Sequence, residues 1–201
     1  MAAFAGKTLI ANGGANDRAI LNAFYAFPNT FGNIRHVYSG ALGTASGITP
    51  TDAFLTLAAA QTAAVADNED IVYVLPGHAE AISGAAGITF SKAGVTYQGI
   101  GRGAGRPTIT WGTAVGAQVL VTGARITFRN ILFDFTGFDN ITAGILISSA
   151  DVTFEDCEFT TNSGTKGVAV GILTAATADR LTIRRCRLDR KSTRLNSSHR
   201  L

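Results

Sequence analysis

Four times in its second half, the chain repeats one six-residue pattern, whose second copy reads Ile126-Thr127-Phe128-Arg129-Asn130-Ile131. In every copy an apolar residue comes first, a threonine second, and an aromatic or aliphatic residue third. The starts of successive copies lie 31, 26 and 29 residues apart. A pattern that recurs about every 20 to 50 residues is typical of a solenoid, in which each repeat stacks on the one before it. The other copies are Val95-Thr96-Tyr97-Gln98-Gly99-Ile100, Val152-Thr153-Phe154-Glu155-Asp156-Cys157 and Leu181-Thr182-Ile183-Arg184-Arg185-Cys186.

The alternation of apolar and polar positions within each copy indicates a β-strand with one buried face. When the copies are stacked, their first and third residues form two inward columns, and their threonines form an outward ladder. The fourth position gives an outward column in which Arg129 and Arg184 flank Glu155. The fifth position makes a corner. Beyond it the inward column resumes with Cys157 and Cys186 and then continues with Phe133, Phe159 and Leu188.

Further short strands are expected between the copies, at residues 108–111, 119–122, 144–149 and 168–174. Each coil then holds two or three strands separated by turn residues, with no helix between them. We therefore predict an all-β fold, a single-stranded right-handed parallel β-helix whose coils lie about 4.8 Å apart. The alternatives are a β-sandwich and an up-and-down barrel, which need hairpins, but no Asn-Gly or Asp-Gly turn links these strands.

A capping α-helix is expected before the first coil, over residues 49–66. Thr49 or Thr51 would cap its start, and Asp52 suits its first turn. A strand follows at residues 71–75. Because a solenoid leaves a hydrophobic end exposed, an amphipathic helix across that end would cover it. Residues 49–82 are thus interpreted as the N-terminal cap with the first coil.

The last residues do not fit the repeat. Residues 189–199 resemble the in-frame translation of a short-read sequencing adapter, which indicates an environmental sequencing assembly. We therefore expect residues 189–201 to be a non-native tail and the natural product to be truncated near Leu188. The remaining chain divides into an N-terminal arm or attachment segment (1–36) and an incomplete β-helix with its capping helix (37–188).

The tail also accounts for the charge of the chain. The full sequence has 17 Lys and Arg against 14 Asp and Glu, a net charge of +3. Residues 189–201 contain four basic residues and one acidic residue, so 13 of each sign remain without them. A neutral chain gives no electrostatic basis for a nucleic-acid partner or an anionic membrane. No run of about 18 apolar residues is present to span a membrane.

A family resemblance rests on the first coil and on a glycine-rich turn. The predicted helix, the acidic turn and Ile71-Val72-Tyr73-Val74 resemble the opening of pectate-lyase-like right-handed β-helix proteins. The run Tyr73-Val74-Leu75-Pro76-Gly77-His78-Ala79-Glu80, together with Gly99-Ile100-Gly101-Arg102-Gly103-Ala104-Gly105-Arg106-Pro107-Thr108-Ile109, resembles β-helix structural proteins of tailed bacteriophages. The likeness covers roughly residues 37–188.

The phage resemblance implies a virion structural or host-contact protein, of the tail-fibre, tailspike or decoration type. Its location would be the virion, and its partners would be other virion proteins and a cell-surface polysaccharide. A homotrimer is one assembly that such a rod permits. The first alternative is a carbohydrate-active polysaccharide lyase or glycoside hydrolase, and the second is a bacterial surface adhesin. Both of these would be extracellular.

The candidate catalytic residues are Asp134, Asp139 and Glu158. Glycosidases place two carboxylates about 5 to 9.5 Å apart across the bond that they cleave, and stacked coils could bring two of these residues together. The structural alternative is that Glu158 forms an ordinary ion pair with Arg187 on the next coil. Trp111 is the candidate aromatic residue for stacking on a sugar ring.

No metal site and no cofactor are expected. No Asp-rich calcium loop occurs. Cys157 and Cys186 fall one coil apart, where parallel side chains disfavour a disulfide, and too few further ligands stand nearby for zinc. We interpret both as free thiols that fill the core. His78 and Glu80 are interpreted as turn residues, because no nucleophile stands at a recognisable spacing.

Overall fold

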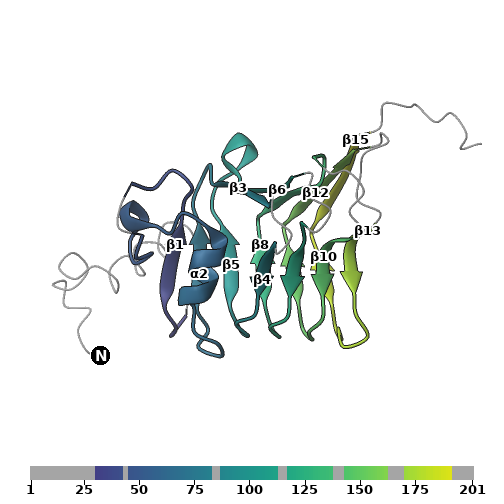
Figure 1. Cartoon of the computed structure of the whole chain (residues 1–201), viewed down its shortest axis with the longest axis horizontal. Coiled ribbons are helices and arrows are strands. Elements are labelled where there is room, and N and C mark those ends of the chain that lie inside the picture. The colour runs from purple at the N-terminus through teal and green to yellow at the C-terminus, as the bar shows by residue number, and fades with distance from the viewer. Residues whose placement is uncertain are drawn as a thin grey trace, which may run out of the picture.

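A computed structural model gives the architecture of the chain and describes residues 30–42, 45–82, 87–112, 117–137, 143–162 and 170–191. These residues form an all-β parallel solenoid of about four turns with one short α-helix (Figure 1). Strands of successive coils pair in parallel throughout the described part of the chain, which confirms the predicted β-helix. A β-sandwich or an up-and-down barrel would require antiparallel neighbours.

Three sheets run along the solenoid axis, and the chain visits sheets A, B and C in turn. Sheet A contains β1 (Ile34–Val37), β2 (Ile71–Val74), β5 (Thr96–Gly99), β8 (Thr127–Arg129), β11 (Thr153–Glu155) and β14 (Thr182–Arg184). Sheet B contains β3 (Ala79–Ile82), β6 (Thr108–Trp111), β9 (Leu132–Asp134), β12 (Glu158–Asn162) and β15 (Arg187–Lys191). Sheet C contains β4 (Ile88–Phe90), β7 (Val119–Val121), β10 (Ala143–Ile147) and β13 (Val170–Thr174).

The register of sheet A is the one that the repeat predicts. Phe128 pairs with Tyr97 on one side and with Phe154 on the other, and the four repeat threonines align across β5, β8, β11 and β14. The first-position residues Ile126 and Val152 are fully buried. A one-residue slip would turn these side chains outward, so the hydrophobic pattern fixes the register.

Stacked rings fill the space between the sheets. The rings of Tyr97, Phe128 and Phe154 lie 5.4 and 5.1 Å apart and are nearly parallel. Phe133 and Phe159 make a second stack on sheet B, with their centroids 5.2 Å apart. The two stacks meet edge to face, an arrangement that aromatic rings favour. Towards both ends of the described solenoid the same columns continue with aliphatic residues, such as Val72 and Ile183 on sheet A.

The corner between sheets A and B is built by residues with positive φ. Asn130, Asp156 and Arg185 have φ of 52°, 54° and 50°. Asn130 also donates from its side-chain amide to the carbonyl oxygens of Gly99 and Gly101, both at 3.0 Å. Short polar side chains tolerate this conformation, and the hydrogen bonds of Asn130 tie its corner to the coil before it.

The predicted helix over residues 49–66 is wrong in its extent. The segment holds a 3-10 helix, η1 (Pro50–Asp52), and then the α-helix α2 (Leu57–Ala63). Phe54 between them is extended and bridges Val37 in parallel, so strand pairing with β1 replaces helical turns there. Thr56, rather than Thr49 or Thr51, caps α2, because its hydroxyl accepts a hydrogen bond from the Ala59 amide.

The cap itself is confirmed. Helix α2 packs against β1 and β4 and buries Leu57, Ala60 and Gln61 (Figure 1). It follows β1 and contacts the first strand of sheet C, so it covers the N-terminal edge of that sheet. An edge covered in this way cannot pair with another chain.

The described strands of the solenoid begin at Ile34 and end at Lys191. Strand β1 starts at Ile34 and pairs with β2, so residues 34–36 belong to the solenoid. Asp189 and the two residues after it continue β15 and pair with residues 160–162 of β12, although they lie in the adapter-like stretch. Residues 1–29 and 192–201 lie outside the described residues.

Candidate functional site

The candidate carboxylates lie on the outer face of sheet B. Asp134 ends β9 and Glu158 begins β12, the next strand of the sheet. Phe133 and Phe159, their neighbours along the chain, are buried in the core, so alternation turns both carboxylates outward. The stacked coils thus bring these two residues to one surface, as the sequence suggested.

The register gives their separation. Glu158 pairs with Leu132, two residues before Asp134. Two residues of strand and one strand spacing put the two Cα atoms on the order of 8 Å apart. Glycosidases place their two carboxyl groups about 5 to 9.5 Å apart, so strand neighbours of this kind are close enough for their side chains to be considered as a pair. Asp139, the third candidate, lies outside the described residues.

Asp134 is engaged in local hydrogen bonds. Its Oδ1 accepts from the hydroxyl of Thr160 on β12 and from the backbone amide of Thr136, both at 2.9 Å. The second bond is an Asx turn, which ends β9 and starts the loop after it. Asp134 therefore joins two coils and shapes a turn.

Glu158 is engaged in ion pairs. Its Oε2 accepts from Nη1 of Arg106 at 2.8 Å, and Nη1 of Arg187 lies 3.7 Å from Oε1. The Arg187 contact was predicted from the repeat. The Arg106 contact was not, because Arg106 lies in the glycine-rich turn before β6, two coils away. Both carboxylate oxygens thus face a guanidinium group.

Trp111 lies in the core rather than on the surface. Its side chain is 3% exposed, and its ring centroid lies 4.7 Å from that of Phe135. It follows Ile109 by two residues on β6, so alternation turns it inward with that residue. The interpretation as a surface residue that stacks on sugar is therefore corrected for Trp111.

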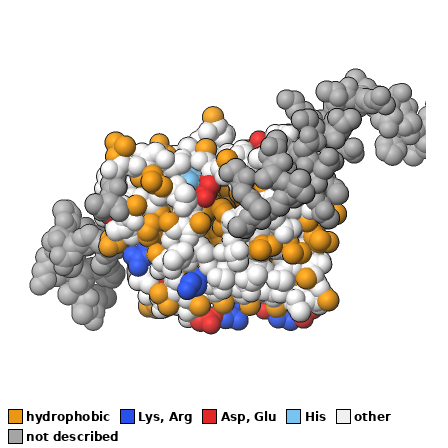
Figure 2. Space-filling model, viewed as in Figure 1, with side chains coloured by type: hydrophobic (Ala, Val, Ile, Leu, Met, Phe, Trp, Pro, Cys, Tyr) orange, Lys and Arg blue, Asp and Glu red, His pale blue; other side chains and the backbone are white. Residues whose placement is uncertain are grey.

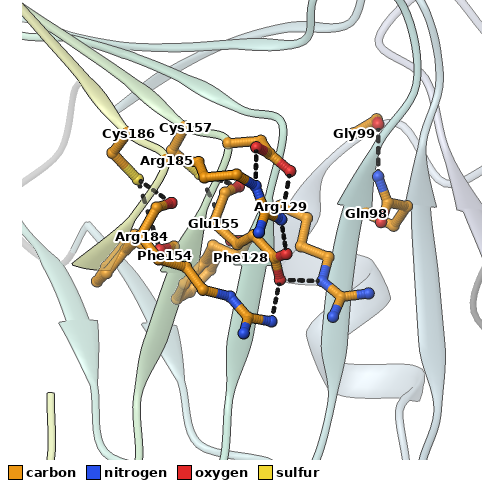
Figure 3. Close-up of polar contacts among 11 residues, drawn as sticks. Gln98, Gly99, Phe128, Arg129, Phe154, Glu155, Cys157, Arg184, Arg185 and Cys186 are labelled. Carbon is orange, nitrogen blue, oxygen red and sulfur yellow. Dashed lines mark hydrogen bonds and ion pairs between the residues drawn. The ribbon is translucent and has the colours of Figure 1, made fainter. Parts of the chain in front are cut away.

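The outer face of sheet A holds a dense charge cluster around Glu155 (Figure 3). Its Oε2 accepts from Nε of Arg129 at 2.8 Å and from Nη2 of Arg184 at 2.7 Å. Arg185 contacts both Glu155 and Asp156. We call these five residues the Glu155 cluster.

Glu155 is only 5% exposed, although the sequence suggested an ordinary surface pair. The arginine side chains that surround its carboxylate account for this burial. Burial raises the pKa of Glu155, but the hydrogen bonds from Arg184 and Arg185 and the charge of Arg129 outweigh it. The pKa of Glu155 therefore lies below its ordinary value. A hydrogen bond from Arg185 likewise lowers the pKa of Asp156.

Two similar pairs line the corner between sheets C and A. Arg180 makes a two-bond contact with Asp151 on the preceding coil, at 2.5 and 2.7 Å. Arg125 pairs with Asp67 across the position of Gly94, which has no side chain to block the contact. Figure 2 shows acidic and basic side chains alternating along one edge of the molecule. Charges on this surface are thus matched from coil to coil.

His78 and Glu80 anchor the capping helix. Glu80 accepts a hydrogen bond from the Leu57 amide, the first residue of α2, at 2.7 Å, and its Oε2 lies 3.3 Å from Nε2 of His78. A carboxylate at a helix N-terminus also interacts favourably with the helix dipole. The pair therefore has a structural use, which sequence spacing alone did not reveal.

The two cysteines are free and stacked one coil apart (Figure 3). Cys157 is buried and Cys186 is partly exposed, which agrees with their interpretation as thiols that fill the core. Burial raises the pKa of Cys157, whereas a hydrogen bond from the Cys157 thiol lowers the pKa of Cys186.

Within the described ranges, no group of three or more His, Cys, Asp and Glu residues is placed to hold a metal ion. Over the same ranges, no helix has both the length and the apolar character needed to cross a bilayer. Comparisons with known proteins identify no relative: neither a family model, nor a curated protein, nor a solved structure matches the chain. The pectate-lyase-like and phage resemblances therefore remain predictions that rest on the motifs quoted above.

Proposed function

We propose that this β-helix is a structural or host-contact part of a tailed-phage virion, as a tail fibre, tailspike or decoration protein. In this proposal its partners are other virion proteins and a cell-surface polysaccharide. The phage assignment comes from the resemblance of residues 73–80 and 99–109. The structural role is argued below from the charged groups on the surface.

The observation that carries the proposal is the use of outward charges as links between coils. Glu155, Asp151 and Glu158 each pair with an arginine on another coil. Links of this kind run parallel to the solenoid axis and add to the backbone ladders that resist separation of the coils. A rod stiffened along its axis suits display and attachment.

The second candidate function is polysaccharide cleavage. It is favoured by the placement of Asp134 and Glu158 on neighbouring strands of one outer face. Against it, Asp134 is used in an Asx turn and Glu158 in an ion pair. A catalytic pair would need to release one of these contacts to reach a substrate.

Two measurements separate the candidates. Purified protein is incubated with a panel of bacterial surface polysaccharides, and both retention on the polysaccharide and chain cleavage are followed. Cleavage is read as unsaturated product by ultraviolet absorbance and as new reducing ends. The proposed role predicts retention on at least one polysaccharide without either product. Cleavage that disappears in Asp134→Asn and Glu158→Gln, but persists in Asp151→Asn, would instead establish the enzyme.

The virion assignment has its own test, the genes that flank this reading frame in its source genome. Capsid, portal or tail genes on both sides are expected. A flanking set of polysaccharide-utilisation genes would overturn the assignment to a virion.

A further inference from the structure

The thiols of Cys157 and Cys186 occupy the same place on successive coils (Figure 3). The Sγ atom of Cys157 lies 3.4 Å from the carbonyl oxygen of Phe128 on the preceding coil. The Sγ atom of Cys186 lies 3.4 Å from the carbonyl oxygen of Phe154, which pairs in register with Phe128. The second contact is therefore the first one moved along the axis by one coil. The two side chains run parallel, and their sulfur atoms are separated by roughly the coil spacing of about 4.8 Å.

This separation suits a metal ion between the two sulfur atoms. A disulfide needs them only about 2.05 Å apart, so parallel thiols on adjacent coils do not favour it. A bond between a metal ion and a thiolate is about 2.3 Å long, and two such bonds in line span about 4.6 Å. The stacked thiols thus match an ion with two ligands, whose bonds would lie along the solenoid axis.

The number and type of ligands select the ion. Within the part of the chain that the structure describes, no third His, Cys, Asp or Glu completes a metal-binding group with the two cysteines. Structural zinc sites and iron–sulfur clusters take four ligands, and calcium takes oxygen ligands. Thiolates are soft ligands that favour copper(I), an ion that is stable between two sulfur atoms.

We propose that Cys157 and Cys186 together bind one copper(I) ion, which clips two successive coils to each other. The ion replaces the two thiol protons, which pass to solvent, and copper and sulfur keep their oxidation states. The complex of one copper(I) with two thiolates carries one negative charge. Backbone amides stabilise this charge, because the amide of Ile131 hydrogen-bonds to the sulfur of Cys157 and the amide of Cys157 to that of Cys186.

The surroundings of the two thiols provide both entry and shielding. Cys186 is partly exposed, so an ion can reach the pair from its side. Cys157 is 1% exposed and belongs to the hydrophobic core, against which Cys186 packs. An apolar shell of this kind restricts the access of water to a metal ion. The two sulfur atoms would therefore be the only ligands.

The test is a titration of the reduced full-length chain with copper(I) in the absence of oxygen. Bathocuproine disulfonate, a coloured copper(I) chelator, competes for the ion. The unaltered chain should retain one copper, seen by native mass spectrometry at low protein concentration as a monomer that has gained one copper and lost two protons. X-ray absorption at the copper edge should show sulfur neighbours alone. Cys186→Ser, at a partly exposed position, should lose the retained copper.

Ile131 offers matched variants, because it precedes Cys157 in the same inward column. Ile131→Cys combined with Cys186→Ser again places two thiols on adjacent coils and should retain copper. Ile131→Cys combined with Cys157→Ser keeps two thiols but places them two coils apart, about 9.6 Å, and should lose it. Circular dichroism establishes that each variant is folded.

The outcomes are distinct. The proposal is overturned if the unaltered chain yields its copper to the chelator, or if copper is held between two chains. Retention by Cys186→Ser, or by the folded variant whose thiols lie two coils apart, would show that copper binds without the stacked pair and would overturn it as well. The comparison of Cys186→Ser with the unaltered chain decides the matter even if the substitutions at Ile131 unfold the protein.

Discussion

At the scale of single residues, the two stacked thiols differ in environment despite their equivalent positions in the repeat. Cys157 lies within the stack of coils, where its Sγ is 3.4 Å from the carbonyl oxygens of Phe128 and Glu155. Cys186 lies on the last coil and is partly exposed. Thiolate is the reactive form of cysteine, so the difference in pKa and exposure makes Cys186 the reactive member of the pair.

We predict that iodoacetamide alkylates Cys186 in the folded protein and leaves Cys157 unmodified until the chain unfolds. The rate at Cys186 should reach half of its maximum at a pH below about 8.5, the ordinary cysteine value. Cys157→Ala removes the thiol that lowers the pKa of Cys186, so the midpoint should move to higher pH. Mass spectrometry of peptides quenched over a pH series gives both rates. Preferential alkylation of Cys157 would contradict the prediction.

Glu155 supports a second prediction at this scale. The folded-state pKa of Glu155 is lowered, so its charge stabilises the fold above the unfolded pKa of about 4.3, and this contribution is lost as the pH falls through the folded value. Glu155→Gln should destabilise the protein by about 1–2 kcal/mol at pH 7, a figure reduced because its arginine partners are partly exposed. The deficit should shrink progressively below about pH 4.3.

Urea unfolding at pH 7 and at pH 3 measures this difference. Gln98→Glu is the matched control, because position 98 occupies the same outward column two coils earlier. Gln98→Glu should change the free energy of unfolding at pH 7 only slightly. A deficit for Glu155→Gln that is equally large at pH 3 would show that lost packing, and not lost charge, is responsible.

At the scale of the elements, the sequence predicts strands better than it predicts the cap. Alternation marked the strands of sheet A because each has one buried and one outward face, and the copies could be compared. The helix was overextended because Phe54 fits the helical spacing as well as it fits a strand. Its pairing with Val37 depends on β1, which no repeat marks.

The repeat also explains which contacts of the candidate site could be predicted from the sequence. Glu158 and Arg187 were predicted as partners because they occupy equivalent strand positions on adjacent coils. Arg106 was missed because it lies in a turn whose path no periodicity describes, and its contact with Glu158 skips one coil. Trp111 was predicted as a sugar-stacking residue, whereas alternation along β6 turns it into the core.

A prediction for the cap follows from its N-terminus. Thr56→Ala removes the hydroxyl that accepts from the Ala59 amide, and we expect a loss of about 1 kcal/mol in the free energy of unfolding. Thr62→Ala is the matched control on the same helix, since its hydroxyl donates to Ala58 O, a contact that adds little to helix stability. When both variants are unfolded by heat, only Thr56→Ala should show a lower Tm than the unaltered protein. An equal fall in both would contradict the capping role.

At the scale of the whole molecule, stability is distributed along one dimension. Apart from ion pairs such as Arg106–Glu158 that reach past one coil, each coil contacts the coils beside it, so the free energy of the rod is approximately a sum over neighbouring coils. The inner coils are stabilised by packing on both sides, as where the ring of Phe128 stacks between those of Tyr97 and Phe154. The two ends of the described solenoid differ: α2 covers the first, whereas the last coil leaves large apolar side chains exposed.

That last coil gives a prediction for the chain as a whole. Ile183 on β14 is 48% and Leu188 on β15 78% exposed, and the outer edges of both strands have no partner strand among the described residues. Exposed edges of this kind promote association between chains. We expect the average mass of the full chain in sedimentation equilibrium to rise with concentration. Ile183→Lys with Leu188→Lys should reduce that rise, because paired charges repel at the contact.

Thr182→Lys is the control for this experiment, because it adds a charge to the same strand on its outward face and leaves the apolar end unchanged. It should associate like the unaltered chain. If the double variant associates as strongly as the control, the contact between chains lies elsewhere, and the outer faces of sheets B and C become the surfaces to test. If the average mass stays that of the monomer over about a hundred-fold range of concentration, the last coil does not promote association between chains.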